Sequence, residues 1–135
     1  MKDKTIAVDF DGTIVEDRYP GIGPLVPQAA EILTRFHAAG GRIILWTCRT
    51  GTDLLAAMRF LKQNNIPIDK INSQFEDALA AFQDSYPHVA EVDGRKVAAD
   101  MYIDDRNPGG VDWGMVDRLL FGDDDGSQLT RGGQP

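Results

Sequence analysis

Short apolar runs rich in β-branched residues alternate along the chain with longer segments whose apolar residues recur every three or four positions. The short runs predict buried strands at residues 5–8, 43–46 and 97–103. The helical spacing predicts helices at residues 27–39, 52–63, 75–82 and 113–121. A further short strand is predicted at 66–68, where Pro67 would restrict it to the margin of a sheet.

The pattern also predicts how two of the helices begin, end and pack. Thr52 is expected to cap the second helix, which Asn64 and Asn65 close. The inner face of that helix is expected to consist of Leu54, Leu55, Met58 and Leu61. The last helix presents its own apolar set for packing, namely Met115, Val116, Leu119 and Leu120.

The alternation of strands and helices predicts an α/β fold. A crossover connection is needed to run the next strand in the same direction, so alternating elements favour a parallel sheet with helices on both faces. We therefore expect a three-layer α/β/α sandwich around a doubly wound, Rossmann-like sheet. In such sheets the ligand crevice lies outside the carboxyl ends of the strands. The polar residues at those ends are Asp9, Asp11, Thr47, Asp104 and Asp105.

The aspartates at two of the strand ends indicate a cation site. Asp9 and Asp11 lie two residues apart, so both can face one cleft while Phe10 turns back toward the core. Four carboxylates that converge from two strand ends repel one another, and a hard divalent cation, most plausibly Mg²⁺, relieves that repulsion. A metal held by carboxylates suits phosphoryl transfer, and a carboxylate can itself attack phosphorus.

Length and charge narrow the choice of function. The 135 residues favour one domain, and the patterned part of the chain covers residues 1–121. Residues 122–135 are polar and glycine-rich with nothing to bury, so a disordered tail is predicted there. The formal net charge of −7 repels polyanions, which disfavours a nucleic-acid partner.

Cysteine content and hydropathy predict a cytoplasmic protein without a membrane span. The single cysteine, Cys48, cannot form an intramolecular disulfide, and the segment MKDKTIAVDF lacks the apolar centre of a secretion signal. No apolar run approaches the roughly 20 residues that a membrane-spanning helix needs. Cys48 is expected to be a buried filler, because no histidine partner is recognisable near it.

Four motifs make the chain resemble the haloacid dehalogenase superfamily of phosphohydrolases that use an aspartate nucleophile. In the order of the family these motifs are Asp9-Phe10-Asp11-Gly12-Thr13, Thr47, a lysine and Asp104-Asp105. The resemblance covers residues 5–121. The first and last motifs are specific at this spacing, whereas the threonine or the lysine alone would be a weak signal.

The resemblance implies a mechanism and a metal site. Asp9 would attack the substrate phosphorus, and Asp11 would protonate the leaving alcohol and later deprotonate the hydrolytic water. Mg²⁺ would be held by Asp9, by the main-chain carbonyl of Asp11, and by one or both of Asp104 and Asp105. The acid at Asp11 favours a phosphatase or a phosphotransferase over a dehalogenase or an ion-pumping ATPase.

Phosphate binding would fall to the remaining motif positions. The resemblance implies that Thr47 hydrogen-bonds a phosphoryl oxygen, that Gly12 belongs to the phosphate-binding set, and that a lysine neutralises the nucleophile and the phosphate. Lys96 is the preferred catalytic lysine because it adjoins the strand carrying the last motif, although the family usually spaces the two more widely; Lys70 is the alternative. Arg49 could reach a phosphate or carboxylate with its forked guanidinium, or form a surface ion pair.

The chain differs from most members of the family in having no room for a cap domain. Neither the segment after the first motif nor the segment between Thr47 and the lysine is long enough to hold one. An uncapped site is associated in the family with macromolecular substrates or with a neighbouring subunit that serves as the lid. Given the net charge, we expect a small phosphorylated metabolite and a homo-oligomer. Arg18 and Tyr19 either set specificity or are ordinary loop residues.

The predicted function is Mg²⁺-dependent hydrolysis of a phosphomonoester through an aspartyl-phosphate. A catalytically silent relative that keeps the site for binding, and a phosphotransferase, are the alternatives. A phospho-accepting signalling receiver also carries an acidic pocket on a parallel sheet, but there the adjacent acids follow the first strand and the lysine comes last. Here the adjacent acids, Asp104 and Asp105, come last, which disfavours a receiver.

Overall fold

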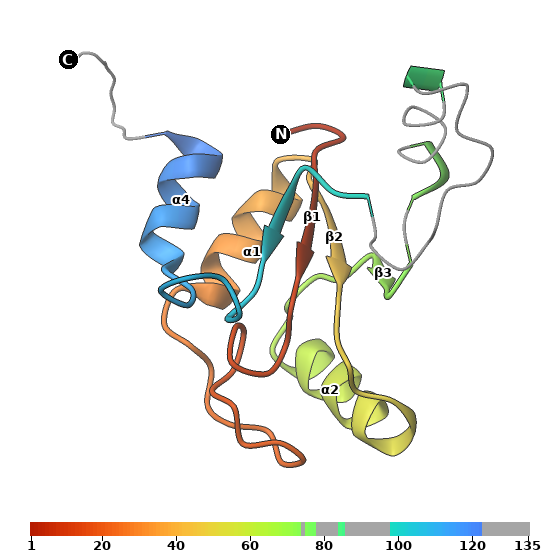
Figure 1. Ribbon diagram of the computed structural model, residues 1–135, viewed down its shortest axis with the longest axis vertical. Coiled ribbons are helices and arrows are strands. Elements are labelled where there is room, and N and C mark those ends of the chain that lie inside the picture. Colours follow the sequence, from red (N-terminus) through yellow and green to blue (C-terminus); the bar gives the residue numbers. More distant parts are fainter. Residues whose placement is uncertain (74, 78–83, 86–97, 123–135) are drawn as a thin grey trace.

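Strands and helices alternate along the chain (Figure 1), as the hydrophobic pattern predicts. The computed structural model describes residues 1–73, 75–77, 84–85 and 98–122. The strands are β1 (Thr5–Val8), β2 (Arg42–Leu45), β3 (Lys70–Ile71) and β4 (Met101–Ile103). The helices of the described residues are α1 (Ala29–Ala38), α2 (Gly51–Gln63) and α4 (Trp113–Phe121). None of these helices is both long and apolar enough to cross a membrane.

The four strands form one parallel sheet in the order β3-β2-β1-β4. Ile6 of the central strand β1 is in register with Ile43 on one side and with Met101 on the other. The chain therefore moves outward from β1 to β3 and then returns to place β4 on the opposite side of β1. Because this reversal is the mark of a doubly wound sheet, the predicted Rossmann-like α/β fold is confirmed.

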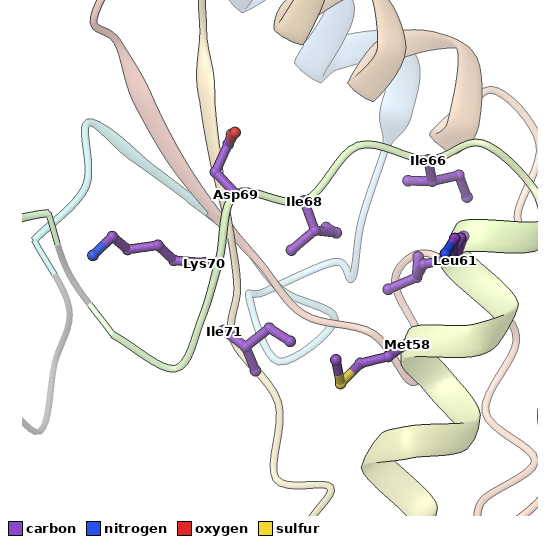
Figure 2. Close-up of a pocket in the computed structure, with 8 residues that line it drawn as sticks. Met58, Leu61, Ile66, Ile68, Asp69, Lys70 and Ile71 are labelled. Carbon is purple, nitrogen blue, oxygen red and sulfur yellow. The ribbon is translucent and has the colours of Figure 1, made fainter.

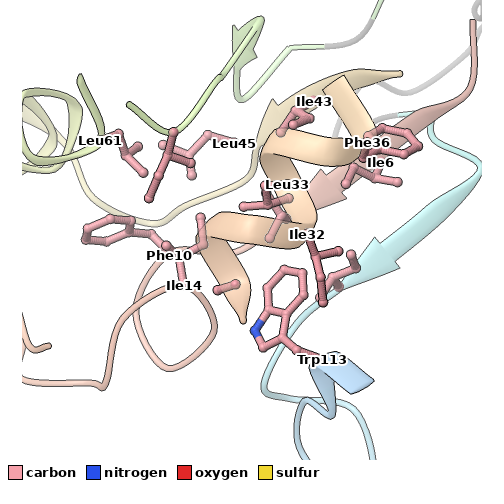
Figure 3. Close-up of a cluster of buried hydrophobic side chains, with 14 of the residues drawn as sticks. Ile6, Phe10, Ile14, Ile32, Leu33, Phe36, Ile43, Leu45, Leu61 and Trp113 are labelled. Atoms are coloured by element: carbon pink, nitrogen blue, oxygen red, sulfur yellow. The ribbon is translucent and has the colours of Figure 1, made fainter. Parts of the chain in front are cut away.

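The main hydrophobic core lies between one face of the sheet and the three helices (Figure 3). The sheet contributes alternate residues of its two central strands, such as Ile6 and Leu45, because successive side chains of a strand point to opposite faces. The helices contribute apolar residues at helical spacing. These include Ile32, Leu33 and Phe36 of α1, Leu61 of α2, and Trp113 of α4. Each such buried side chain stabilises the fold by about 1.5–3 kcal/mol.

A smaller apolar cluster lies on the opposite face of the sheet. Its buried members are Ala7 and Ile44, and Trp46, Phe75 and Ala99 pack against them. Phe75 and Ala99 belong to the connection from β3 to β4. Since crossovers between parallel strands are right-handed, that returning connection must pass over the face opposite to α1 and α2, and these two residues do so.

The predicted edge strand at 66–68 is wrong, because pairing with β2 begins later. Ile66 is buried, and its amide still donates to Leu61 at the end of α2 over 2.9 Å. Pro67 has no amide hydrogen to donate to a ladder. The ladder starts at Asp69, whose amide donates to the carbonyl of Ile43 over 2.8 Å. The marginal position of this strand is correct, since β3 lies at the edge of the sheet.

Two predicted features of α2 are wrong in whole or in part. The N-cap residue of the helix is Thr50, whose side chain makes no capping hydrogen bond, and Thr52 lies inside the first turn. Of the predicted inner face, Leu61 is buried and Leu54 is half-buried, but Leu55 and Met58 are 54% and 40% exposed, and Ala57 is buried instead. Once Ala57 faces the sheet, positions one turn away join it and the adjacent positions turn outward. The closing role of Asn65 is confirmed by its left-handed φ of 56°.

The last helix follows the prediction in extent but only partly in packing. Val116 of α4 is buried and Leu120 is half-buried, whereas Met115 and Leu119 are exposed. Asp112 caps α4, its side chain accepting from the amide of Met115.

Three other predictions extend beyond the described residues. The strand predicted at 97–103 is β4 only at Met101–Ile103, and Val97 lies outside the described residues. In the helix predicted at 75–82, Glu76 and Asp77 are helical, Phe75 is not, and the rest lies outside. The predicted tail also lies outside, apart from Gly122.

Candidate functional site

Three carboxylates meet where the strand order of the sheet reverses. Asp9 follows β1, and Asp104 and Asp105 follow β4, its parallel neighbour (Figure 1). One carboxylate oxygen from each of the three lies within 4.8 Å of the others. This is the crevice at the carboxyl ends of the strands where α/β sheets bind ligands, and the structure brings together there three of the residues singled out by the sequence.

Thr13 joins the two loops that carry these carboxylates. Its side chain is buried, and its Oγ1 atom donates to Oδ2 of Asp9 over 3.3 Å and accepts from the amide of Asp105 over 3.0 Å. The carbonyl of Thr13 in turn accepts a 3.0 Å hydrogen bond from the indole nitrogen of Trp113. Thr13 is thereby fixed from both sides, and it sets the spacing between the first and last motifs.

Gly12 is required by the close approach of the Asp105 side chain. Its φ is +83°, a conformation that residues with a side chain rarely adopt. A β-carbon at this position would overlap the carboxylate of Asp105. Gly12 therefore lies directly against the acidic group, as its predicted place in the site requires, although nothing tests its predicted contact with phosphate.

Two of the clustered acids are hard to ionise. Burial, followed by the nearby charge of Asp104, raises the pKa of Asp9 to about 7. Burial also raises the pKa of Asp105, as does its interaction with Asp104. Crowded carboxylates with raised pKa values are the environment that a cation relieves, and three oxygen donors suit a hard divalent ion such as Mg²⁺.

Asp11 belongs to a different arrangement, although it is only two residues from Asp9. Its two carboxylate oxygens accept from Nε and Nη2 of Arg49 over 2.8 and 2.7 Å. The side chain of Asp11 is 17% exposed and that of Arg49 is 1% exposed. A carboxylate engaged by a buried arginine in this two-pronged geometry is fixed in position, and it is not one of the three clustered carboxylates.

The guanidinium of Arg49 has no donor left for a substrate. Besides Asp11 it donates to the main-chain carbonyls of Pro20 (3.1 Å), Gly21 (2.8 Å) and Asp53 (3.3 Å). A guanidinium has five N–H donors, so this set uses all of them. Of the two roles considered for Arg49, the ion pair is the one observed, and it is buried rather than on the surface. The predicted contact with phosphate stays a prediction, and it would require Arg49 to give up one of these hydrogen bonds.

Thr47 lies after β2, beside the end of β1, and Asn72 holds it there. The amide of Thr47 donates to Oδ1 of Asn72 over 2.8 Å, and the Asn72 amide group donates back to the Thr47 carbonyl over 2.9 Å. Oγ1 of Thr47 accepts from the amide of Arg49 over 3.1 Å. Because it accepts there, the hydroxyl keeps its own proton for another acceptor. The predicted phosphate contact of Thr47 stays a prediction.

Neither candidate lysine is placed at the carboxylates. Lys96 lies outside the described residues. The amine of Lys70 lies 5.2 Å from the centre of the Phe75 ring, and Figure 2 shows its side chain pointing away from α2. The prediction for Cys48 is wrong: it is exposed, because Arg49 takes the inward position in the loop between β2 and α2.

Sequence reasoning missed three contacts that build the site. The partnership of Thr13 with both acidic loops could have been suspected, since Thr13 lies inside the first motif. The pairing of Arg49 with Asp11 links residues 38 apart and had no local signal. Asn72 had none either, because it follows a two-residue strand that the pattern did not predict.

A separate apolar pocket of about 520 Å³ lies between α2 and β3 (Figure 2). Its lining is mainly aliphatic, with Met58, Leu61 and Ile71 among the side chains. The carboxylate of Asp69 in its wall is already used by the amide of Ile43 (2.7 Å) and by His37 (3.1 Å). The pocket contributes no residue to the acidic site.

Comparison with known proteins relates the fold to solved structures. The structure of a conserved protein from Bacteroides thetaiotaomicron is similar, with 38% identity, a TM-score of 0.71, and coverage of 88% of this chain and 90% of that chain. A chain of the Pnkp1/Rnl/Hen1 RNA repair complex is 22% identical at a TM-score of 0.51, over 78% of this chain and 37% of its own length. A chain of a second Pnkp1/Rnl/Hen1 structure is 21% identical at a TM-score of 0.51, over 96% of this chain and 46% of its own length. The likeness to these last two shows the fold alone. No model of a known protein family and no curated protein matches this chain.

Proposed function

This chain belongs to the family of the conserved Bacteroides thetaiotaomicron protein, and we propose that it hydrolyses phosphomonoesters with Mg²⁺ as cofactor and Asp9 as nucleophile. We also propose that the chain is a member of the haloacid dehalogenase superfamily, which its motifs resemble. The observation that carries the proposal is the group of three carboxylates at the reversal of the strand order, with a fourth, Asp11, held separately two residues from Asp9.

The chemistry of the donors fits a hard divalent cation. Asp9, Asp104 and Asp105 offer oxygens within 4.8 Å of one another, and burial, followed by the interaction with Asp104, raises the pKa of Asp9 and of Asp105. These three side chains would hold Mg²⁺, together with the main-chain carbonyl of Asp11. When bound, Mg²⁺ would neutralise the negative charge of the carboxylates and of the phosphoryl oxygens.

The reaction divides between two aspartates. A carboxylate oxygen of Asp9 attacks the phosphorus, the bond from phosphorus to the ester oxygen breaks, and Asp11 gives its proton to the departing alkoxide. Water then attacks the phosphorus of the aspartyl-phosphate while Asp11 takes a proton from that water. Inorganic phosphate leaves, Asp9 is restored, and Asp11 again carries its proton. Thr13 keeps Asp9 in position throughout, through its 3.3 Å hydrogen bond.

The finer features belong to the same proposal. A small phosphorylated metabolite suits a chain with a net charge of −7 better than a polyanion does. The loop between β1 and α1 is fully described, and its only pairing consists of single bridges of Val15 with Asp11 and Leu25, so it forms no cap over the site. The absence of a cap in this loop is compatible with a homo-oligomer in which a second subunit covers the site. A cytoplasmic location stays a prediction.

The test is phosphate release from a panel of phosphorylated metabolites and p-nitrophenyl phosphate, in Mg²⁺ and in excess chelator. The proposal predicts turnover in Mg²⁺ that the chelator abolishes and that added Mg²⁺ restores. Turnover that is unaffected by the chelator contradicts the role of the metal. If the folded, Mg²⁺-binding protein releases no phosphate from any compound, the proposed hydrolysis is wrong and a binding role takes its place.

A further inference from the structure

We propose that Arg49 is a positioning residue for acid–base catalysis, which fixes the orientation of the Asp11 side chain; this inference rests on the proposed function. The contacts of its guanidinium carry the argument. Two donors go to Asp11, and the other three go to main-chain carbonyls at Pro20, Gly21 and Asp53.

The guanidinium of Arg49 is held rigidly. The three carbonyl acceptors come from the loop between β1 and α1 and from the first turn of α2, so Arg49 is anchored to two separate elements. The guanidinium carbon of Arg49 also lies 5.2 Å from the centre of the Phe10 ring and 5.0 Å from that of the Tyr19 ring. A planar group held at every donor and in contact with two aromatic rings cannot rotate without breaking several contacts.

The same guanidinium orients Asp11. Parallel hydrogen bonds to both carboxylate oxygens fix the plane of the carboxyl group and its side-chain rotamer. Each oxygen retains a further lone pair, which is where a catalytic proton can be held. The pair with Arg49 therefore holds the carboxyl group of Asp11 in one orientation for proton transfer.

Tyr19 is 56% exposed and yet held in place. Its hydroxyl donates to Oδ2 of Asp53 over 3.0 Å, and its amide donates to Oδ1 of Asp17 over 3.1 Å. The loop that carries Tyr19 is therefore fastened to α2 by a side-chain contact as well as by Arg49. These contacts hold the arginine, and through it Asp11, in a preorganised state before any substrate is present.

The experiment compares two substrates that differ in their need for an acid. An alkyl phosphate releases a strongly basic alkoxide that must be protonated, whereas p-nitrophenyl phosphate releases a weakly basic phenolate. For Arg49→Lys, kcat/KM toward the alkyl phosphate is expected to fall about 10²-fold or more, and toward p-nitrophenyl phosphate less than about 10-fold. The quantity to compare is kcat/KM, because it reports the steps up to phosphoryl transfer to Asp9.

Three further variants make the result specific. Asp11→Asn is expected to show the same preference for the aryl substrate, and Arg49→Lys combined with Asp11→Asn to add little to either single loss. Arg59→Lys, at an exposed position of α2, is the matched control and is expected to behave as wild type. If Arg49→Lys does not fold, Arg49→Gln is the second variant, because its side-chain amide keeps a planar group with N–H donors.

A readout independent of turnover accompanies these rates. Mg²⁺ affinity measured by calorimetry is expected to change less than about 3-fold in Arg49→Lys, since Arg49 contacts none of the three clustered acids. Losses of about 10-fold or more are expected when a group that orients a metal ligand is removed. Equal losses on both substrates, a loss confined to KM, or undiminished activity would each overturn the positioning role. Absence of turnover by wild type on both substrates overturns the proposed function, and this inference with it.

Discussion

Asp9 and Asp11 lie two residues apart in one loop, but the protein treats the two carboxylates in opposite ways. Asp9 lies beside Asp104 and Asp105, and burial, followed by the charge of Asp104, raises its pKa to about 7. Asp11 is matched by a buried arginine that satisfies both of its oxygens. The difference indicates that the acidic cluster around Asp9 calls for a cation from outside the chain, whereas the charge of Asp11 is already balanced by Arg49 within the chain.

The difference between Asp9 and Asp11 arises from their positions in the segment that follows β1. Asp9 follows β1 and lies toward β4, after which the second acidic loop begins. Asp11 lies two residues further on, toward the loop between β2 and α2 that carries Arg49. Gly12 and Thr13 then bring the chain back against Asp105. One short turn thus divides its carboxylates between two neighbours of β1.

Removing the nucleophile should have the largest effect. Asp9→Asn is expected to lower kcat by about 10⁴-fold or more, because no other group in the reaction as proposed can form the covalent intermediate. Phosphate release in Mg²⁺ measures this loss. Asp3→Asn is the matched control, since Asp3 is exposed and its φ of 64° is one that asparagine tolerates. Turnover by Asp9→Asn at the wild-type rate would contradict the mechanism.

Removing the internal partner of Asp11 altogether should also destabilise the fold. Arg49→Ala leaves a nearly buried carboxylate without its partner and abandons three carbonyl acceptors, so the free energy of unfolding is expected to fall by about 3–5 kcal/mol. Urea denaturation followed by circular dichroism measures the change. A loss below about 1 kcal/mol, the size found for exposed ion pairs, would show that this pair is not a buried structural element.

Removing the hydroxyl between the two acidic loops should weaken the cation site. Thr13→Val keeps the shape of the side chain but removes its hydrogen bonds to Asp9 and to the amide of Asp105. Mg²⁺ affinity is expected to fall about 10- to 100-fold, as when groups that orient metal ligands are lost. Calorimetric titration checks it, with Thr34→Val on the exposed side of α1 as control. Unchanged affinity would mean that Thr13 serves packing alone.

The smallest effect concerns stability and pH in the absence of metal. The pKa of Asp9 is about 7 in the folded protein and about 3.9 in an unfolded chain. The folded state therefore binds more protons between these values, and the contribution of Asp9 to stability is lost as the pH rises from about 4 through about 7. Discounted for its partial exposure, this amounts to about 1–2 kcal/mol.

Asp9→Asn removes that titration and should reverse the usual cost of a mutation. Metal-free Asp9→Asn is expected to be more stable than wild type at pH 8 and to lose this advantage near pH 4. Urea unfolding of both proteins across this range measures the difference, which cancels the titration of the other carboxyl groups. An advantage that is constant with pH would show that the acidic cluster does not destabilise the folded state.

The sequence predicts the elements that bury one face, and it predicts the strand ends that carry the acids. β1, α1 and the end of β4 lie where their apolar patterns place them, because each element buries most of the apolar side chains in its pattern. The strand predicted at 66–68 failed because Ile66 is buried by the end of α2 rather than by the sheet. The predicted inner face of α2 is correct only in part, because Ala57 and Leu61 are the buried residues and the adjacent Met58 is exposed.

In the candidate site, residue type was predictable and partnership was not. The motif spacing identifies Asp9, Asp104 and Asp105 as neighbours, since parallel strands end at the same edge of the sheet. It does not reveal that Asp11 turns toward Arg49, because that choice depends on carbonyls from two other segments that complete the arginine's hydrogen bonds. Contacts of this kind are set by the tertiary structure alone.

The most direct test of the contrast between the two carboxylate groups is calorimetric titration of Mg²⁺ into wild type, Asp104→Asn and Asp11→Asn, each confirmed as folded by circular dichroism. We predict that wild type binds Mg²⁺, that Asp104→Asn weakens binding at least about 10-fold, and that Asp11→Asn, which keeps its main-chain carbonyl, stays within about 3-fold of wild type. Absence of binding by wild type, or an equal loss in Asp11→Asn, would contradict the division of labour between the two groups.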